Sequence, residues 1–415
     1  MSGDAAEKST VPVTVLTGFL GAGKTTLLNH ILESPDHGKR FAIIENEFGE
    51  VGVDDKVIKE KSDEIIEVIN GCVCCTVRGD LVKVLKKLED RMPSFDGVII
   101  ETTGLADPAP VAQTFFVEED VLRSYHLDSI ITVVDAKHIL EHLREEKPEG
   151  VENESVEQVA FADRILLNKC DLVDEDKLDE VQKAIKAINK HADVVPTKHC
   201  KADPTKLLNI GAFDIKRVVE MDPEFLNTEG DHQHDSTVSS VSVRFEGELN
   251  YVQLKMWIRK IMLTKANDLF RYKGVLAVAG TGSKYVFQGV HMLFSGNLEP
   301  SHRWKDDETR ECRFVFIGRN LDKEELEKGI MACKVGPLRF SQGDCVKACI
   351  NSNQWATGRV VQIWDEGYPY MIELDVEPGA YACQTWTWAP MDTDDFVQRH
   401  ACACPGSGGA PETEA

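Results

Sequence analysis

The chain has 415 residues, of which 42% are hydrophobic, and its 47 Lys and Arg against 70 Asp and Glu give a formal net charge of −23. This apolar fraction excludes disorder as the main state, and the acidic balance argues against nucleic acid or an anionic membrane as a partner. No apolar run reaches the roughly 18 residues that span a bilayer, and the start MSGDAAEKST contains no apolar signal segment. We therefore expect a cytoplasmic protein whose thiols are reduced.

Short apolar runs alternate with helical patterns over residues 11–222, which predicts an α/β domain with a parallel sheet covered by helices on both faces. The expected strands are filled with Val, Ile and Leu, as buried parallel strands are. They are residues 11–17, 41–46, 64–70, 97–102, 129–136, 164–168 and 192–197, and the clearest helical patterns are residues 25–34, 79–91 and 175–190.

The remaining sequence divides into four parts. A polar linker over 223–236 precedes a predicted small α+β domain over 237–334. Residues 335–400 have the pattern of a small all-β barrel, and the Gly/Pro-rich residues 401–415 are expected to be disordered. The barrel segment is rich in tryptophan, and we expect these side chains to form its core rather than a peptide groove; they are Trp355, Trp364, Trp386 and Trp388.

A phosphate-binding loop is predicted at residues 18–25, where the sequence GFLGAGKT follows an expected strand and opens an expected helix. The glycines let backbone amides turn toward a phosphate, and the helix N-terminus favours the negative charge. Lys24 would neutralise β- and γ-phosphate oxygens, and the Thr25 hydroxyl would hold Mg²⁺.

Two further segments stand in the order that a nucleotide site requires. Glu101 ends an expected strand and could hold the Mg²⁺ shell, while the amide of Gly104 could meet the γ-phosphate. Asn168, Lys169 and Asp171 close another expected strand as NKCD. A carboxylate there can accept two hydrogen bonds from guanine that adenine cannot donate, so the sequence favours GTP over ATP.

Three cysteines lie within four positions, at Cys72, Cys74 and Cys75. Three thiolates on one turn suit a soft or borderline ion, Zn²⁺ first, with a fourth ligand from elsewhere. A redox-active dithiol and buried small hydrophobes are the alternatives. His232 and His234 fit a solvated polar loop better than a metal site, and Cys402 and Cys404 are expected to be unligated.

Taken together, GFLGAGKTTLLNHIL, ENEFGEVGVD, NGCVCC, ETTGLADP and NKCD resemble, in this order, the CobW-like metallochaperone GTPases, and most of all their eukaryotic zinc-regulated branch. The resemblance covers residues 11–334, while the segment after it is similar to SH3-like modules appended to diverse proteins. The resemblance implies a P-loop GTPase that hydrolyses GTP and delivers a transition metal bound at the C-x-C-C motif to a client enzyme. It implies phosphate contacts from Gly18, Gly21, Ala22, Gly23, Lys24, Thr25 and Thr26, Mg²⁺ contacts from Thr25 and Glu101, and guanine contacts from Asn168, Lys169 and Asp171.

The resemblance also has limits. Glu47, in the ENEFGE segment, is our candidate for the residue that positions the attacking water. The N-terminal docking peptide for a methionine aminopeptidase is absent from MSGDAAEKSTVP, so that client is an open expectation. Delivery of Co²⁺ is the alternative within this class, because thiolates bind both metals with similar geometry; a zinc buffer or sensor and a redox-switched GTPase are the alternatives outside it.

Overall fold

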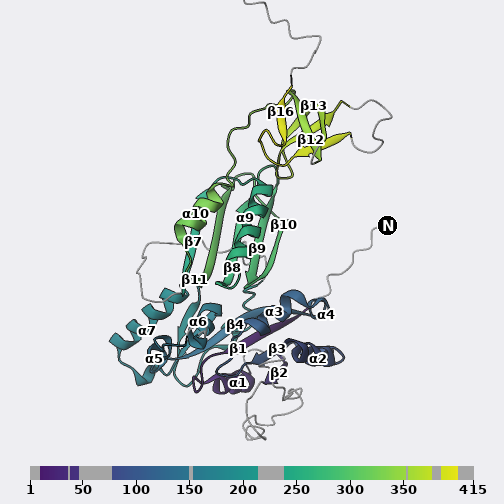
Figure 1. Ribbon diagram of the computed structural model, residues 1–415. Helices are drawn as coiled ribbons and strands as arrows, with labels where there is room; N and C mark the ends of the chain where they lie inside the picture. Colours follow the sequence, from purple (N-terminus) through teal and green to yellow (C-terminus); the bar gives the residue numbers. More distant parts are fainter. Residues whose placement is uncertain are drawn as a thin grey trace, which may run out of the picture.

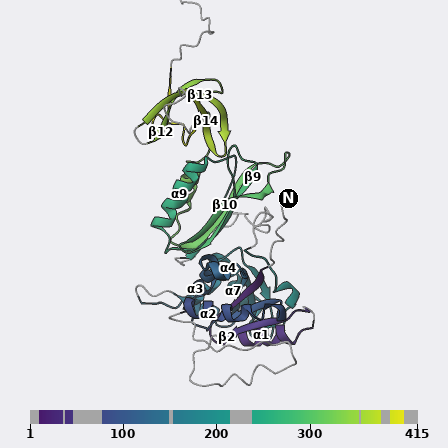
Figure 2. The same ribbon diagram turned by 90° about the vertical axis from the view of Figure 1, so that its right-hand side faces the viewer.

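The computed structural model shows three modules stacked in chain order, from an α/β module through a mixed module to a small β module (Figure 1). Figure 2 shows the same stacking after a quarter turn. The predicted fold class, a parallel-sheet P-loop domain followed by an α+β domain and a small all-β module, is confirmed. The residues that the structure describes are 10–35, 38–45, 77–148, 153–213, 238–351, 354–375 and 385–400.

The expected strand at 64–70, the linker at 223–236 and the tail at 401–415 lie outside the described residues. In the part of the chain that is described, no helix has both the length and the apolar character needed to span a bilayer.

The α/β module is built on a six-stranded parallel sheet in the order β2-β3-β1-β4-β5-β6. The sheet extends from β1 to one side through β3 and β2 and to the other side through β4, β5 and β6. The carboxyl end of β1 is therefore the point at which the strand order reverses, and ligands bind at this point in such sheets. The elements of this module are β1 (Val11–Thr17), α1 (Lys24–Glu33), β2 (Phe41–Glu45), α2 (Val77–Glu89), η1 (Met92–Ser94), β3 (Gly97–Glu101), α3 (Ala109–Val117), α4 (Glu119–Leu122), β4 (Tyr125–Asp135), α5 (Ile139–Leu143), α6 (Glu154–Phe161), β5 (Arg164–Asn168), η2 (Cys170–Leu172), α7 (Glu175–Ile188), β6 (Asp193–Pro196) and η3 (Pro204–Lys206).

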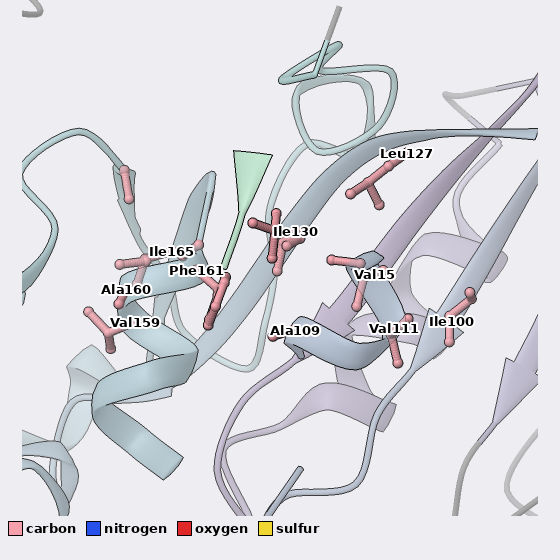
Figure 3. Packing of buried hydrophobic residues seen from close by; sticks show 14 of the residues in the cluster. Val15, Ile100, Ala109, Val111, Leu127, Ile130, Val159, Ala160, Phe161 and Ile165 are labelled. Atoms are coloured by element: carbon pink, nitrogen blue, oxygen red, sulfur yellow. The ribbon is translucent and has the colours of Figure 1, made fainter. Parts of the chain in front are cut away.

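Helices cover both faces of this sheet. Because successive strand residues point to opposite sides, each strand contributes side chains to both buried faces. In β3, Ile100 belongs to the apolar cluster that contains residues of α2, α3, α6 and α7, whereas Ile99 belongs to the cluster that contains residues of α1. Figure 3 shows the first of these clusters, to which the strands contribute Val15 and Ile130 and the helices contribute residues such as Val111 and Phe161. The nearly continuous apolar runs in the sequence follow from this two-sided burial.

The second module has a five-stranded antiparallel sheet in the order β10-β9-β8-β11-β7. Helices α9 and α10 cover one face of this sheet (Figure 1). One of its strands, β10, was not predicted from the sequence. The elements are β7 (Val238–Glu246), α9 (Tyr251–Thr264), β8 (Leu269–Ala277), β9 (Ser283–Val290), β10 (Leu293–Arg303), β11 (Glu311–Arg319) and α10 (Lys323–Met331).

The other face of that sheet packs on the α/β module and shares its core. Phe270 of β8 lies 5.8 Å from Phe161 of α6 between ring centroids. Beside this contact, the Arg271 guanidinium forms a buried ion pair with Asp163 and donates to the Phe161 carbonyl oxygen at 3.2 Å. Five residues of the second module join the apolar cluster of the first; they are Val238, Phe270, Val290, Val315 and Ile317.

The third module is an antiparallel sheet in the order β15-β14-β13-β12-β16, which confirms its all-β character. Its core contains Phe340, Tyr370 and small aliphatic residues. The expectation that its four tryptophans form this core is wrong, since none is buried and Trp386 and Trp388 are 44% and 38% exposed. The strands are β12 (Cys345–Asn351), β13 (Gln354–Asp365), β14 (Tyr368–Leu374), β15 (Trp386–Ala389) and β16 (Val397–Arg399).

Candidate nucleotide and metal site

The loop between β1 and α1 has the backbone that a phosphate cradle needs. Gly18, Gly21 and Gly23 adopt φ values of 140°, 73° and 115°, a region that residues with a Cβ rarely enter. A Cβ on Gly18 would also lie 2.2 Å from the Val133 carbonyl oxygen of β4, so the loop starts in close contact with the neighbouring strand. Backbone conformation therefore favours glycine at all three positions, and Gly18 and Gly23 also have no space for a Cβ.

Lys24 and Thr25 sit at the start of α1, at the carboxyl end of β1. The Lys24 ammonium donates to the Gly18 carbonyl oxygen at 2.8 Å and to that of Phe19 at 3.4 Å, and its side chain is buried. Burial lowers the pKa of Lys24, an effect that the nearby Glu101 carboxylate partly offsets. An ammonium group that is removed from water has lost favourable hydration free energy. A bound phosphate would stabilise the charge again, so this position of Lys24 favours an anionic ligand.

Glu101 ends β3 next to β1, where its carboxylate accepts a hydrogen bond from the Thr25 hydroxyl at 3.1 Å. The hydroxyl and carboxylate oxygens predicted to serve Mg²⁺ are thus adjacent, and oxygen atoms are the ligands that this ion prefers. The donor set fits a magnesium-bound nucleotide. A Cβ on Gly104 would lie 2.7 Å from the Leu20 amide nitrogen, so the segment that follows Glu101 approaches the phosphate loop closely.

Asn168, at the end of β5, is buried and connects two loops. Its amide nitrogen donates to the Ala22 carbonyl oxygen of the phosphate loop at 3.0 Å, and its amide oxygen accepts from the Cys200 amide at 2.9 Å. The Cys200 thiol in turn contacts the Gly23 carbonyl oxygen at 3.2 Å. Asn168 therefore positions the loop next to it rather than offering a free group to a base.

Lys169 and Asp171 lie at the same edge of the sheet. Lys169 has a φ of 61° and its ammonium pairs with Asp135, the last residue of β4, at 2.7 Å. Burial opposes ionisation of Asp135, but hydrogen bonds from His138 and Lys169 outweigh it and keep the pKa of Asp135 below its ordinary value. Asp171, in η2, is exposed and free to accept hydrogen bonds from a base.

Thr26 is exposed on the first turn of α1, beside the buried Lys24. Two residues of the site were not predicted from the sequence. Asp135 orders Lys169, and Cys200 completes the contacts of Asn168. Asp135 ends β4 and Cys200 follows β6, and both strands end at the same sheet edge as the motifs; this topological position is the signal that could have identified them. Burial raises the pKa of Cys200 to about 11, so its thiol is a packing group and not a reactive one.

The predicted zinc ligands Cys72, Cys74 and Cys75 and the candidate Glu47 lie outside the described residues, as do His232 and His234. Within the described ranges, no group of three His, Cys, Asp or Glu side chains is arranged to hold a metal ion. The segment with the cysteines connects β2, which ends at Glu45, with α2, which begins at Val77. Glu45 is the register partner of Glu101, so this segment leaves the sheet beside the predicted Mg²⁺ ligand.

Two family models match the chain. The CobW/HypB/UreG nucleotide-binding domain matches residues 12–196, and the cobalamin synthesis protein cobW C-terminal domain matches residues 238–334. The zinc chaperone YjiA of Escherichia coli is 38% identical over 321 residues, which cover 76% of this chain and 96% of that protein. The zinc-regulated GTPase metalloprotein activator 1 of Schizosaccharomyces pombe is 32% identical over 349 residues, covering 75% of this chain and 83% of that protein.

Among solved structures, that of the Zn(II)-bound YjiA GTPase from Escherichia coli matches with a TM-score of 0.62 and 34% identity, over 79% of this chain and all of that one. Residues 335–400 lie beyond both family models. The matches extend over the sheet, the phosphate loop and the second module together. This chain belongs to the CobW/HypB/UreG family of P-loop GTPases.

Proposed function

We propose that this protein is a GTP-hydrolysing metallochaperone that binds Zn²⁺ at Cys72, Cys74 and Cys75 and transfers it to a client metalloenzyme in a nucleotide-dependent way. The observation that carries the proposal is the contact between the Thr25 hydroxyl and the Glu101 carboxylate, 3.1 Å apart beside a buried Lys24. The relatives named above as zinc chaperones and zinc-regulated activators support the choice of metal.

Hydrolysis would rest on positioning and charge neutralisation, as phosphoryl transfer generally does. The amides of the glycine-rich loop would hold the β-phosphate, and Lys24 would exchange its bonds with the Gly18 and Phe19 carbonyl oxygens for β- and γ-phosphate oxygens. Thr25 and Glu101 would hold Mg²⁺, which when bound offsets the negative charge of the phosphates. This chain supplies the cradle and the cation, and low turnover without a partner is the expected behaviour.

Guanine selection would come from Asp171, whose exposed carboxylate can accept from the N1–H and exocyclic amine of guanine. Lys169 is held by Asp135, so its aliphatic stem would pack against the plane of the base while its charge stays paired. Asn168 would fix the relative position of the base loop and the phosphate loop through its bonds to Ala22 and Cys200.

Coupling to zinc would run through β2, the strand that precedes the cysteine motif in the chain. β2 ends at Glu45, the register partner of Glu101, so a change at the Mg²⁺ site would be passed to the chain that follows β2 through this strand pair. Binding of GTP and Mg²⁺ would complete the thiolate site, and hydrolysis would loosen it so that a client can take the ion. We propose the cytoplasm as its compartment, where such thiols are reduced.

The test is a competition titration of Zn²⁺ against a chromophoric chelator, with the full chain loaded with GDP or with a non-hydrolysable GTP analogue. The triple variant Cys72→Ser/Cys74→Ser/Cys75→Ser is the blank, and a parallel titration with Co²⁺ compares the two metals. Tighter Zn²⁺ binding with the GTP analogue, lost in the blank, is expected, and Zn²⁺ must then strengthen binding of the analogue by the same factor. Equal affinity in both nucleotide states would exclude gated transfer.

The GTPase step has its own test. Thr25→Ala removes the hydroxyl next to Glu101 and is expected to lower the rate of phosphate release from GTP by about a hundredfold, or 2.7 kcal/mol of activation free energy. Thr25→Ser retains a hydroxyl at the same place and is the matched control, with a rate within about threefold of the original. A Thr25→Ala variant that hydrolyses GTP at the original rate would contradict the assigned site.

A further inference from the structure

A groove of about 520 Å³ runs between α9 and the edge strand β10 in the second module. Figures 1 and 2 both show this helix beside this strand. The helix contributes residues spaced three and four apart, which places them on one face. The helical wall consists of Tyr251, Lys255, Ile258, Arg259 and Met262, and the strand side consists of Tyr285 and the segment 292–297.

The floor of the groove is formed by aromatic rings, and a glycine lets them pack closely against the strand. Phe294 stacks against Phe287 and Tyr272 with ring centroids 6.1 and 6.2 Å apart, and Tyr251 meets Tyr285 edge-on at 6.0 Å. A Cβ on Gly296 would lie 2.4 Å from the Phe294 ring and 2.7 Å from the Tyr285 hydroxyl. Because Gly296 has no side chain, the Phe294 ring and Tyr285 can pack down against the strand as the apolar floor on which a side chain from another molecule could lie.

The dimensions and the edge favour an extended peptide. From Tyr251 to Met262 the helix advances about 16 Å at its usual rise per residue, which an extended segment spans with about five residues. Among the strands that the structure describes, β10 pairs only with β9, which leaves its outer edge for main-chain hydrogen bonds from an added strand. Met292, at the turn before β10, is 66% exposed and extends the apolar surface at this end.

The charge of the rim determines the kind of peptide. Lys255 and Arg259 line the groove, and neither forms an ion pair with any residue that the structure describes; Lys255 instead lies 4.8 Å from the Tyr251 ring. Lys265, just beyond the end of the same helix, is paired with Glu325 at 2.9 Å. In a chain with a net charge of −23, two cations without a carboxylate beside an apolar groove are complementary to an acidic ligand.

One end of the groove touches the nucleotide module, since Phe116 of α3 lines it. This helix starts at Ala109, five residues after Gly104, whose segment lies against the phosphate loop. A molecule in the groove would therefore contact the helix that follows Gly104, whose amide is predicted to meet the γ-phosphate. This position favours a partner whose binding affects the nucleotide site.

We infer that this groove docks an extended, acidic segment of a client protein, anchored by one apolar side chain against Phe294 and Tyr285. The identity of the partner as a client rests on the proposed function, whereas the docking of an acidic segment rests on the groove itself. The rim cations contact the acidic residues of the segment, and β10 supplies main-chain bonds.

The test uses a random 12-residue peptide library displayed on phage and selected against the full GDP-loaded chain. Consensus peptides are then synthesised with fluorescein and titrated by fluorescence anisotropy. We expect Asp and Glu around one aromatic or aliphatic residue, and an affinity that falls at least tenfold in Lys255→Glu/Arg259→Glu. Lys260→Glu reverses one charge on an exposed position of α9 that does not line the groove, and is expected to leave the affinity within twofold.

A second variant, Ser295→Trp, narrows the groove from the exposed strand side without changing charge and should also weaken binding at least tenfold. Selected peptides that are basic, or that bind both groove variants as tightly as the original chain, would overturn the inference, as would a groove that binds a labelled single-stranded oligonucleotide but no peptide. Titrations of the same samples with GDP and with Zn²⁺, in the absence of peptide, test the proposed function separately. If the original chain binds neither GDP nor Zn²⁺, the proposed function is wrong, whatever the peptide result.

Discussion

The amide nitrogen of Asn168 lies 3.0 Å from the Ala22 carbonyl oxygen, so the predicted base-reading motif and the phosphate loop are joined by a direct hydrogen bond. The same side chain accepts from the Cys200 amide, which draws a third loop to the site. All three loops follow parallel strands that end at one sheet edge. Occupancy of the base site and the shape of the phosphate cradle are consequently linked through one buried amide.

Replacing Asn168 with Ala is expected to lower both the affinity for GDP and the stability of the folded protein. The change leaves the Ala22 carbonyl and the Cys200 amide without their partner, at a cost of about 1–3 kcal/mol in the free energy of unfolding. Asn189→Ala is the control, because Asn189 bonds three carbonyl oxygens of residues 159–162 away from the loop. Both variants should lose stability in urea titrations, but only Asn168→Ala should lose GDP affinity beyond tenfold.

Asp171→Asn should convert a guanine site into a xanthine site. An amide cannot accept both hydrogen bonds that guanine donates, but its NH₂ group can donate to the second carbonyl of xanthine. We expect GTP affinity to fall about a hundredfold and XTP affinity to rise, with ATP binding unchanged and weak. Competition against a fluorescent GDP analogue measures all three, and an unchanged GTP affinity would show that another residue reads the base.

Arg271→Met should strongly destabilise the protein. Arg271 and Asp163 are 6% and 4% exposed, so removal of the guanidinium leaves a buried carboxylate without its counterion. Such a change costs about 3–5 kcal/mol. Arg123→Met is the control, since Arg123 is 73% exposed and its pairing with Glu119 should be worth under about 0.5 kcal/mol. Equal unfolding midpoints in urea for the two variants would argue against a buried pair between the modules.

Lys273 predicts a pH dependence of stability. Burial and the neighbouring Arg271 lower the pKa of Lys273 from 10.5 to about 8 in the folded protein. Below pH 8 both states carry the charge and the folded state bears its burial cost; between pH 8 and 10.5 the unfolded state binds more protons, so stability rises with pH.

Lys273→Met should therefore be about 1–3 kcal/mol more stable than the original chain at pH 7, and this advantage should shrink as the pH approaches 10. Urea unfolding at a series of pH values measures the difference directly. A constant difference between the two proteins from pH 7 to 10 would mean that Lys273 titrates normally in the folded state.

Motifs at strand ends could be predicted because parallel topology brings them together. The phosphate loop, Glu101 and NKCD stand far apart in sequence, yet each follows a run of Val, Ile and Leu, and all such runs in one sheet end at one edge. The roles within NKCD were less visible. Whether Asn168 faces the base or the loop depends on the Ala22 carbonyl, 146 positions away, which no local pattern encodes.

Strand β10 could not be predicted because its local signals are weak. Its sequence LFSGNLEPSHR has little alternation, and it is joined to β9 by His291 and Met292 instead of the Asn-Gly type of turn. His291 nevertheless adopts a φ of 50°, as a tight hairpin requires. Pairing with β9 overrides the poor propensity. The prediction that tryptophans form the core of the third module was wrong for another reason, because aromatic content does not show which side of a strand faces water. Trp388 donates its indole N–H to the Asp365 carboxylate at 2.9 Å.

The core shared by the first two modules determines where the chain can be cut. A chain ending after residue 213 would retain every described residue of the nucleotide site, but it would present Phe161 and its neighbours to water in place of Phe270. Asp163 would face solvent without Arg271, and the bare surface would favour self-association over a soluble monomer. A fragment that keeps the predicted nucleotide site and also keeps this face covered therefore has to include the second sheet, β7 to β11.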